Sequence, residues 1–157
     1  MKETAMKDTT TPQDAQRPVH RLIAIYAESH RNPTNEVIHF ICVPVIVFSF
    51  LGLIWALHPL AAVAVMLLSL GYYFRLSVSF GVGMLLMSGA MLWVLTVLPQ
   101  AQVLPISVGV FVVAWIGQFI GHKIEGKKPS FFDDLRFLLI GPLFVLSFLY
   151  RRLRISY

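Results

Sequence analysis

Residues 30–39 read HRNPTNEVIH and stand directly before the first long apolar run of the chain. Pro33 disfavours a helical conformation for the residue before it, so a helix that approaches from the N-terminal side is expected to end here. The next helix can start at once, with Asn32 as its N-cap and Pro33 at its first position. On one straight helix, nine residues would set His30 and His39 roughly 180° apart. The predicted break instead allows the two imidazoles to converge.

The composition indicates a helical membrane protein. Of 157 residues, 57% are hydrophobic and 13% are charged, which is more apolar surface than a soluble core of this length can bury. Between Ile38 and Gly121 the one formal charge is Arg75. Turn residues divide this run into four segments long enough to cross a bilayer, with Pro105 opening the fourth, predicted at 38–57, 59–74, 79–98 and 104–121. The fold class that we predict is therefore all-α, a polytopic helical membrane protein.

The two ends of the chain are expected to add shorter elements to these spans. Residues 1–18 are polar and are predicted to be a disordered tail, whereas residues 19–157 are predicted to form a single helical membrane domain. Residues 19–29 mix apolar and charged side chains, which is typical of an interfacial helix at the membrane surface. A fifth apolar run, 135–150, is short and contains Gly-Pro at 141–142. We predict a bent or re-entrant C-terminal helix pair there, which returns to the face that it entered.

The distribution of cations predicts the sidedness. Lysine and arginine residues gather before the first span, after the second and after the fourth, while the loops near His58 and Gln100 carry none. The positive-inside rule then places both polar stretches on the cytoplasmic side, in the inner membrane of a bacterium or the endoplasmic reticulum of a eukaryote. The phospholipid bilayer is thus an expected partner. Nucleic acid is not, because no basic helix with interleaved aromatic residues stands outside the apolar runs.

A second polar stretch, QFIGHKIEGKKP at residues 118–129, closes the fourth predicted span. Gly117 and Gly121 form a small-xxx-small pair there, which lets another helix approach closely. The helix that carries His39 is the natural neighbour, because an even number of crossings brings both polar stretches to one side. Packing alone would also explain the two glycines.

The two stretches together suggest a metal site. Residues 118, 122 and 125 share one helix face, since they are four and three positions apart. Four side chains could surround one ion: His30, His39, His122 and Glu125. Two amide side chains could hold the imidazoles in orientation by hydrogen bonds: Asn35 and Gln118.

The types of donor atom narrow the choice of metal ion, but the residue spacing does not prove that a metal site exists. Imidazoles with at most one carboxylate and no thiolate suit Fe(II), Zn or Mn. Cys42 is the single cysteine, so neither an intrachain disulfide nor a cysteine zinc site is expected. The five histidines lack the clustered boxes of di-iron membrane hydroxylases, and no P-loop or dinucleotide-type glycine pattern is present. Histidines at a membrane edge also serve as plain hydrogen-bonding groups, so both interpretations stay open on spacing alone.

The two motifs resemble those of a known membrane family. Two patterns carry the resemblance: H-x-N-P-x-N-x-x-x-H from residue 30, and Q-F-x-G-H-x-x-E-x-K-K-P from residue 118 with a Gly-Pro apolar segment after it. They are similar to those of the 2-hydroxy fatty acid dioxygenase family, typified by the fungal enzyme that converts phytosphingosine-derived acids to odd-numbered fatty acids, and its bacterial relatives. The resemblance covers roughly residues 26–148, and the spans between the motifs match in hydropathy alone.

This resemblance implies an enzyme with Fe(II) as cofactor. It implies that a long-chain 2-hydroxy fatty acid reacts with O2 and leaves an acid one carbon shorter. The catalytic residues that it implies are His30, His39 and His122. Where the fungal family has a second histidine, directly after residue 30, this chain has an arginine. We hypothesise that the substrate carboxylate is attracted by Arg31, Lys127 or Lys128.

A second hypothesis comes from another functional class. The chain would then be a non-enzymatic lipid-binding or transporter-like membrane protein, in which the histidines bind structural zinc or no metal. Lys123, Lys127 and Lys128 would be solvated positive-inside markers. A homodimer is a further partner that the sequence leaves open.

Overall fold

The computed structural model describes residues 18–27, 30–126 and 137–157 of the chain. These residues form helices and no strand, which confirms the predicted all-α class. The helices are α1 (Pro18–Ala27), α2 (Pro33–Leu57), α3 (Pro59–Leu76), α4 (Val78–Val97), α5 (Gln100–Glu125) and α7 (Gly141–Leu153). Three predictions lie outside the described residues: the disordered tail up to residue 17, the two lysines at 127 and 128, and the start of the C-terminal helix pair.

The predicted helix break is present between α1 and α2. The side-chain Oδ1 of Asn32 accepts a hydrogen bond from the backbone N–H of Thr34 at 2.9 Å, and Asn32 itself is extended, as an N-cap must be. Pro33 follows at the first helical position, where its missing N–H leaves no intrahelical bond unmade. The prediction made from the HRNPTNEVIH stretch is therefore confirmed.

Four of the described helices, α2 to α5, are long and apolar enough to cross a membrane. Their bounds agree closely with the predicted spans, except that Pro105 lies inside α5 and does not open it. The helix starts earlier because the N–H of Gln102 donates to the carbonyl of Pro99 at 2.8 Å. Pro105 then falls in the second turn, where the helix loses one backbone hydrogen bond and continues.

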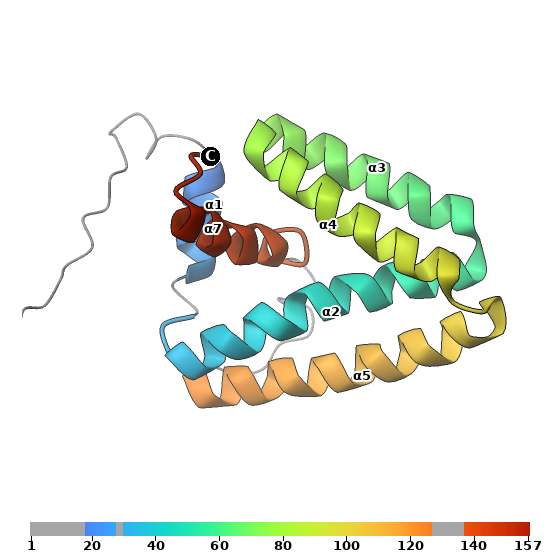
Figure 1. Cartoon of the computed structure of the whole chain (residues 1–157). Coiled ribbons are helices and arrows are strands. Elements are labelled where there is room, and N and C mark those ends of the chain that lie inside the picture. Colours follow the sequence, from blue (N-terminus) through green and yellow to red (C-terminus); the bar gives the residue numbers. More distant parts are fainter. Residues whose placement is uncertain (1–17, 28–29, 127–136) are drawn as a thin grey trace, which may run out of the picture.

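The long helices form two packed pairs, α2 with α5 and α3 with α4 (Figure 1). The α2–α5 pair is close because glycines of α5 face α2. A Cβ atom at Gly121 would collide with Oδ1 of Asn35, and one at Gly117 would lie 2.7 Å from Sγ of Cys42. The small-xxx-small prediction is thus confirmed, and the start of α2 lies beside the end of α5 (Figure 1).

The two short helices, α1 and α7, pack on each other on the side of the bundle where α2 and α4 begin (Figure 1). The α7 helix has 13 residues, fewer than the roughly 20 that a membrane span needs. The sequence predicted a bend at Gly141 and Pro142. Within the described residues, these two residues form the start of α7. Two tyrosine hydroxyls anchor this region: Tyr150 donates to the carbonyl of Ser79 at 2.6 Å, and Tyr73 donates to that of Leu139 at 2.9 Å.

Candidate metal centre

Three imidazoles from three segments of the chain meet at the α1–α2 break. The ring centroids of His30 and His39 are 4.1 Å apart, those of His39 and His122 are 5.0 Å apart, and those of His30 and His122 are 6.0 Å apart. All three side chains are buried, with exposed fractions of 7%, 1% and 7%. The predicted convergence of the two polar stretches is therefore present in the fold.

Backbone carbonyls one helical turn earlier set the orientation of two of the rings. Nδ1 of His30 lies 2.7 Å from the carbonyl oxygen of Tyr26, and Nδ1 of His39 lies 3.0 Å from that of Asn35. A carbonyl oxygen only accepts, so each Nδ1 carries the proton and each Nε2 keeps its lone pair. Nε2 of His39 is buried and has no hydrogen-bond partner in the part of the chain that the structure describes. Metal-binding histidines show this arrangement, with one nitrogen held by a carbonyl and the other left for the ion.

Glu125 joins the end of α5 to the α1–α2 break. Its Oε1 accepts the backbone N–H of Arg31 at 2.9 Å. Its Oε2 accepts the backbone N–H of Asn32 at 2.9 Å and the side-chain N–H of Asn35 at 3.0 Å. We call these three hydrogen bonds the Glu125 clamp. Because the clamped residues adjoin His30 and lie one turn before His39, the clamp holds both imidazoles against α5.

Comparisons with known proteins show the family of this chain. Residues 16–153 match the family model described as "Mpo1-like: 2-hydroxy-palmitic acid dioxygenase Mpo1-like". The chain belongs to the Mpo1-like family. It is also 33% identical over 140 residues to "2-hydroxy-palmitic acid dioxygenase MPO1" of Saccharomyces cerevisiae. This alignment covers 82% of this chain and 78% of the yeast protein. No solved structure matches the chain.

The nitrogen donors of this Mpo1-like chain suit a metal ion, and the distances between the ring centroids are close to those that one shared ion requires. A metal–nitrogen bond of about 2.1 Å puts a ring centroid about 3.2 Å from the ion, so two rings on one ion have centroids about 4.5–5.5 Å apart. The His39–His122 separation falls in this range, whereas the two pairs with His30 are slightly shorter and slightly longer. Within the described residues, however, no three histidine, cysteine or carboxylate side chains lie as close together as ligands of one ion do.

The other predicted site residues have different surroundings in the Mpo1-like fold. Gln118 is buried, and its Oε1 has no hydrogen-bond partner among the described residues. Asn35 orients His39 through its backbone carbonyl, while its side chain belongs to the Glu125 clamp. Arg31 is exposed at the break, next to the cluster.

Two residues of the site are absent from the sequence-based prediction. The ring of Tyr26 stacks on that of His30, with centroids 4.2 Å apart and planes 12° apart. Their four-residue spacing, one helical turn, is a signal that could have revealed this pair. Phe144 of α7 lies 5.6 Å from the His30 ring, and no local sequence signal could have revealed it because it comes from the far end of the chain.

Proposed function

We propose that this chain is an iron(II)-dependent dioxygenase that catalyses the α-oxidation of long-chain 2-hydroxy fatty acids to acids one carbon shorter. The observation that carries the proposal is the group of three buried imidazoles at the α1–α2 break, in a chain of the Mpo1-like family. The name of the yeast relative, a 2-hydroxy-palmitic acid dioxygenase, supports the substrate class.

The proposed overall reaction balances without an added reductant. One 2-hydroxy acid and one O2 give the shortened acid, CO2 and water, so the bond between the carboxyl carbon and C2 breaks and C2 becomes the new carboxyl carbon. Iron(II) bound by imidazoles with open positions supplies oxygen activation in this class of site. His30 and His39 would hold the ion through Nε2, together with the imidazole of His122.

The protein groups around the imidazoles would prepare the site for this reaction. The carbonyls of Tyr26 and Asn35 keep the Nδ1 protons in place, so that each Nε2 stays a ligand. The rings of Tyr26 and Phe144 cover His30 and keep water away from it. The guanidinium of Arg31, exposed beside the break, would attract the substrate carboxylate.

The sidedness is part of the proposal. Arg31, Arg75 and Lys123 lie at the ends of the long helices that share the side of the histidine cluster. The positive-inside rule then supports a site that faces the cytoplasm, at the depth where an amphiphilic acid has its carboxylate in water and its chain in lipid. The inner membrane of a bacterium or the endoplasmic reticulum of a eukaryote would be the location, and a homodimer stays a prediction.

Metal analysis and O2 uptake test this proposal together. The protein is purified in detergent, its iron and zinc contents are measured, and O2 uptake is followed with a long-chain 2-hydroxy acid under ferrous, reducing conditions. We expect bound iron and uptake that requires the 2-hydroxyl group, with the unsubstituted fatty acid as the control substrate. His122→Ala should lose iron and uptake but keep the helical circular dichroism spectrum. Zinc or no metal without uptake would instead favour the lipid-binding or transporter-like alternative.

A further inference from the structure

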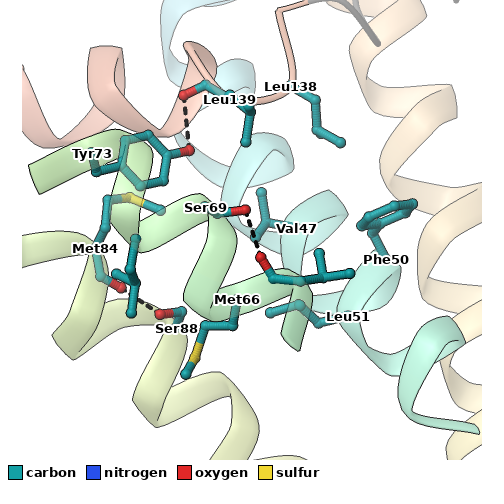
Figure 2. A pocket seen from close by; sticks show the side chains of 12 residues that line it. Val47, Phe50, Leu51, Met66, Ser69, Tyr73, Met84, Ser88, Leu138 and Leu139 are labelled. Carbon is teal, nitrogen blue, oxygen red and sulfur yellow. Dashed lines mark hydrogen bonds between the residues drawn. The ribbon is translucent and has the colours of Figure 1, made fainter. Parts of the chain in front are cut away.

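A deep apolar cavity lies inside the bundle, between α2, α3, α4 and the segment before α7 (Figure 2). Its volume is about 60 Å³. Since a water-sized group needs about 10–15 Å³ of such space, the cavity holds about four to six such groups. Two methionines line it, Met66 and Met84, and their unbranched side chains can adapt to occupants of different length.

The hydroxyl groups that line this cavity are turned back onto the backbone. Ser69 donates to the carbonyl of Val65 at 2.9 Å, and Ser88 donates to that of Met84 at 2.6 Å. The third hydroxyl, of Tyr73, donates to the segment before α7 and not into the cavity (Figure 2). These hydroxyl donors are therefore not available to a ligand in the cavity. An apolar occupant fits such a wall, and water or a polar headgroup does not.

A second, smaller cavity lies between α2, α5 and the segment before α7, and some of its lining residues adjoin the histidine cluster. It has a volume of about 20 Å³, and its lining includes Tyr26, which stacks on His30, and Gln118, one turn before His122. Leu138 lines both cavities and separates them.

The inner face of α2 shows the same order of features. His39, Val43, Val47 and Leu51 follow one another at four-residue intervals on one face of α2, and so pass from the cluster to the small cavity and then to the deep one. Twelve residues of helix span about 18 Å, which is the reach of a long alkyl chain.

We propose that the deep cavity holds the methyl end of the alkyl chain of the 2-hydroxy acid, beside Ser88 and Met84, and that the small cavity lies on the path of the chain from the histidine cluster. This inference rests on the proposed function, because the carboxylate and hydroxyl end must sit at the histidine cluster. The residues around the deep cavity then set the chain length that the enzyme accepts. Leu138 is the partition that the chain must pass.

Chain-length selectivity tests this assignment. Ser88→Leu places a branched side chain in the deep cavity, whereas Ala90→Leu adds the same side chain to the exposed face of the same helix. With saturated 2-hydroxy acids of increasing length, Ser88→Leu should lower kcat/KM for the longest acids by about four-fold for each methylene group that it excludes. The ratio of short-acid to long-acid kcat/KM then rises, and Ala90→Leu should keep the wild-type ratio. An unchanged ratio in Ser88→Leu, or an equal change in both variants, would overturn the assignment.

Photolabelling of the wild-type protein gives a readout that needs neither turnover nor a folded variant. The probe is a long-chain 2-hydroxy acid with a diazirine near its methyl end, and mass spectrometry identifies the modified residues. Modification of Met66 or Met84 that an excess of unlabelled 2-hydroxy acid suppresses would support the cavity. Modification confined to exposed residues such as Leu67 and Leu68, or unaffected by competition, would mean that the probe reports bilayer contact, and the inference fails.

The two experiments separate the inference from the proposed function. Suppressible labelling of the deep cavity without O2 uptake would refute the enzyme and leave an acyl-binding site. Uptake of O2 with labelling only outside the cavity would support the enzyme and refute this binding mode.

Discussion

Replacing Glu125 by glutamine is expected to weaken iron binding, because the clamp lets Glu125 position the residues beside two of the imidazoles. The carboxylate accepts three N–H groups, two from the backbone of Arg31 and Asn32 and one from the side chain of Asn35. Glutamine keeps one acceptor oxygen and turns an amide N–H₂ toward the same donors. At least one backbone N–H then loses its acceptor, and the residues beside His30 are no longer held against α5.

The size of the effect follows from the bonds that are lost. A hydrogen bond to a charged group contributes about 1.5–3 kcal/mol, and the half-exposed position of Glu125 puts its bonds at about the lower figure because of solvent screening. If that free energy holds the two N-terminal imidazoles in place, about 1.4 kcal/mol corresponds to a tenfold weaker Kd for iron. Asn35→Ala removes one donor of the clamp and should weaken binding in the same direction.

Iron titration of detergent-purified variants measures this effect. Glu36→Gln is the matched control, because it makes the same chemical change in the first turn of α2, and Glu36 accepts none of the clamp hydrogen bonds. Its Kd should equal that of the wild type. Glu125→Gln combined with Asn35→Ala should weaken binding by less than the sum of the two single changes, since both break one network.

Two results would refute this account of Glu125. Wild-type iron affinity in Glu125→Gln would mean that the clamp does not position the centre. Additive effects of the two substitutions, together with a changed iron spectrum in Glu125→Gln alone, would instead support the sequence-based hypothesis that Glu125 is itself a ligand.

Three further outcomes are expected. Gly121→Ala should destabilise the α2–α5 pair by about 1–3 kcal/mol because its Cβ meets Asn35, whereas Gly109→Ala in the same helix meets open space and should be neutral or stabilising, as thermal unfolding in detergent would report. Tyr150→Phe removes the hydrogen bond to Ser79 and should lower stability by about 1 kcal/mol, with faster hydrogen exchange in α7 as the measurement. A ferrous chelator should abolish O2 uptake, and added Fe(II) but not Zn(II) should restore it; retained uptake after complete iron removal would contradict the proposed cofactor.

Local chemistry explains what the sequence could predict. The helix break follows from Pro33 and its cap, and the four long helices follow from uninterrupted apolar runs between turn residues. The meeting of His39 with His122 follows from counting crossings, since four spans return the chain to the side where it began. Pro105 misled the prediction of a helix start because a proline signals the first turn of a helix, yet a helix can also carry one in its second turn.

Contacts between distant segments explain what the sequence could not predict. The Glu125 clamp joins positions 90 to 94 residues apart, and two of its three partners are backbone N–H groups, which leave no trace in residue identity. Phe144 reaches His30 only because α7 folds back beside α1. Likewise, the deep cavity arises from packing among four segments, and no single segment carries a pattern that marks it.

The placement of the three histidines also fixes when the centre can come into being. His30 and His39 leave the ribosome early, whereas His122 is made after roughly half of the chain has followed them. No nascent chain can hold all three imidazoles until the last long helix has been synthesised and paired with α2. If the cluster binds iron as we propose, the chain can acquire the ion only after the four long helices have been made and paired. An incompletely inserted chain would then have no complete site at which iron could react with oxygen.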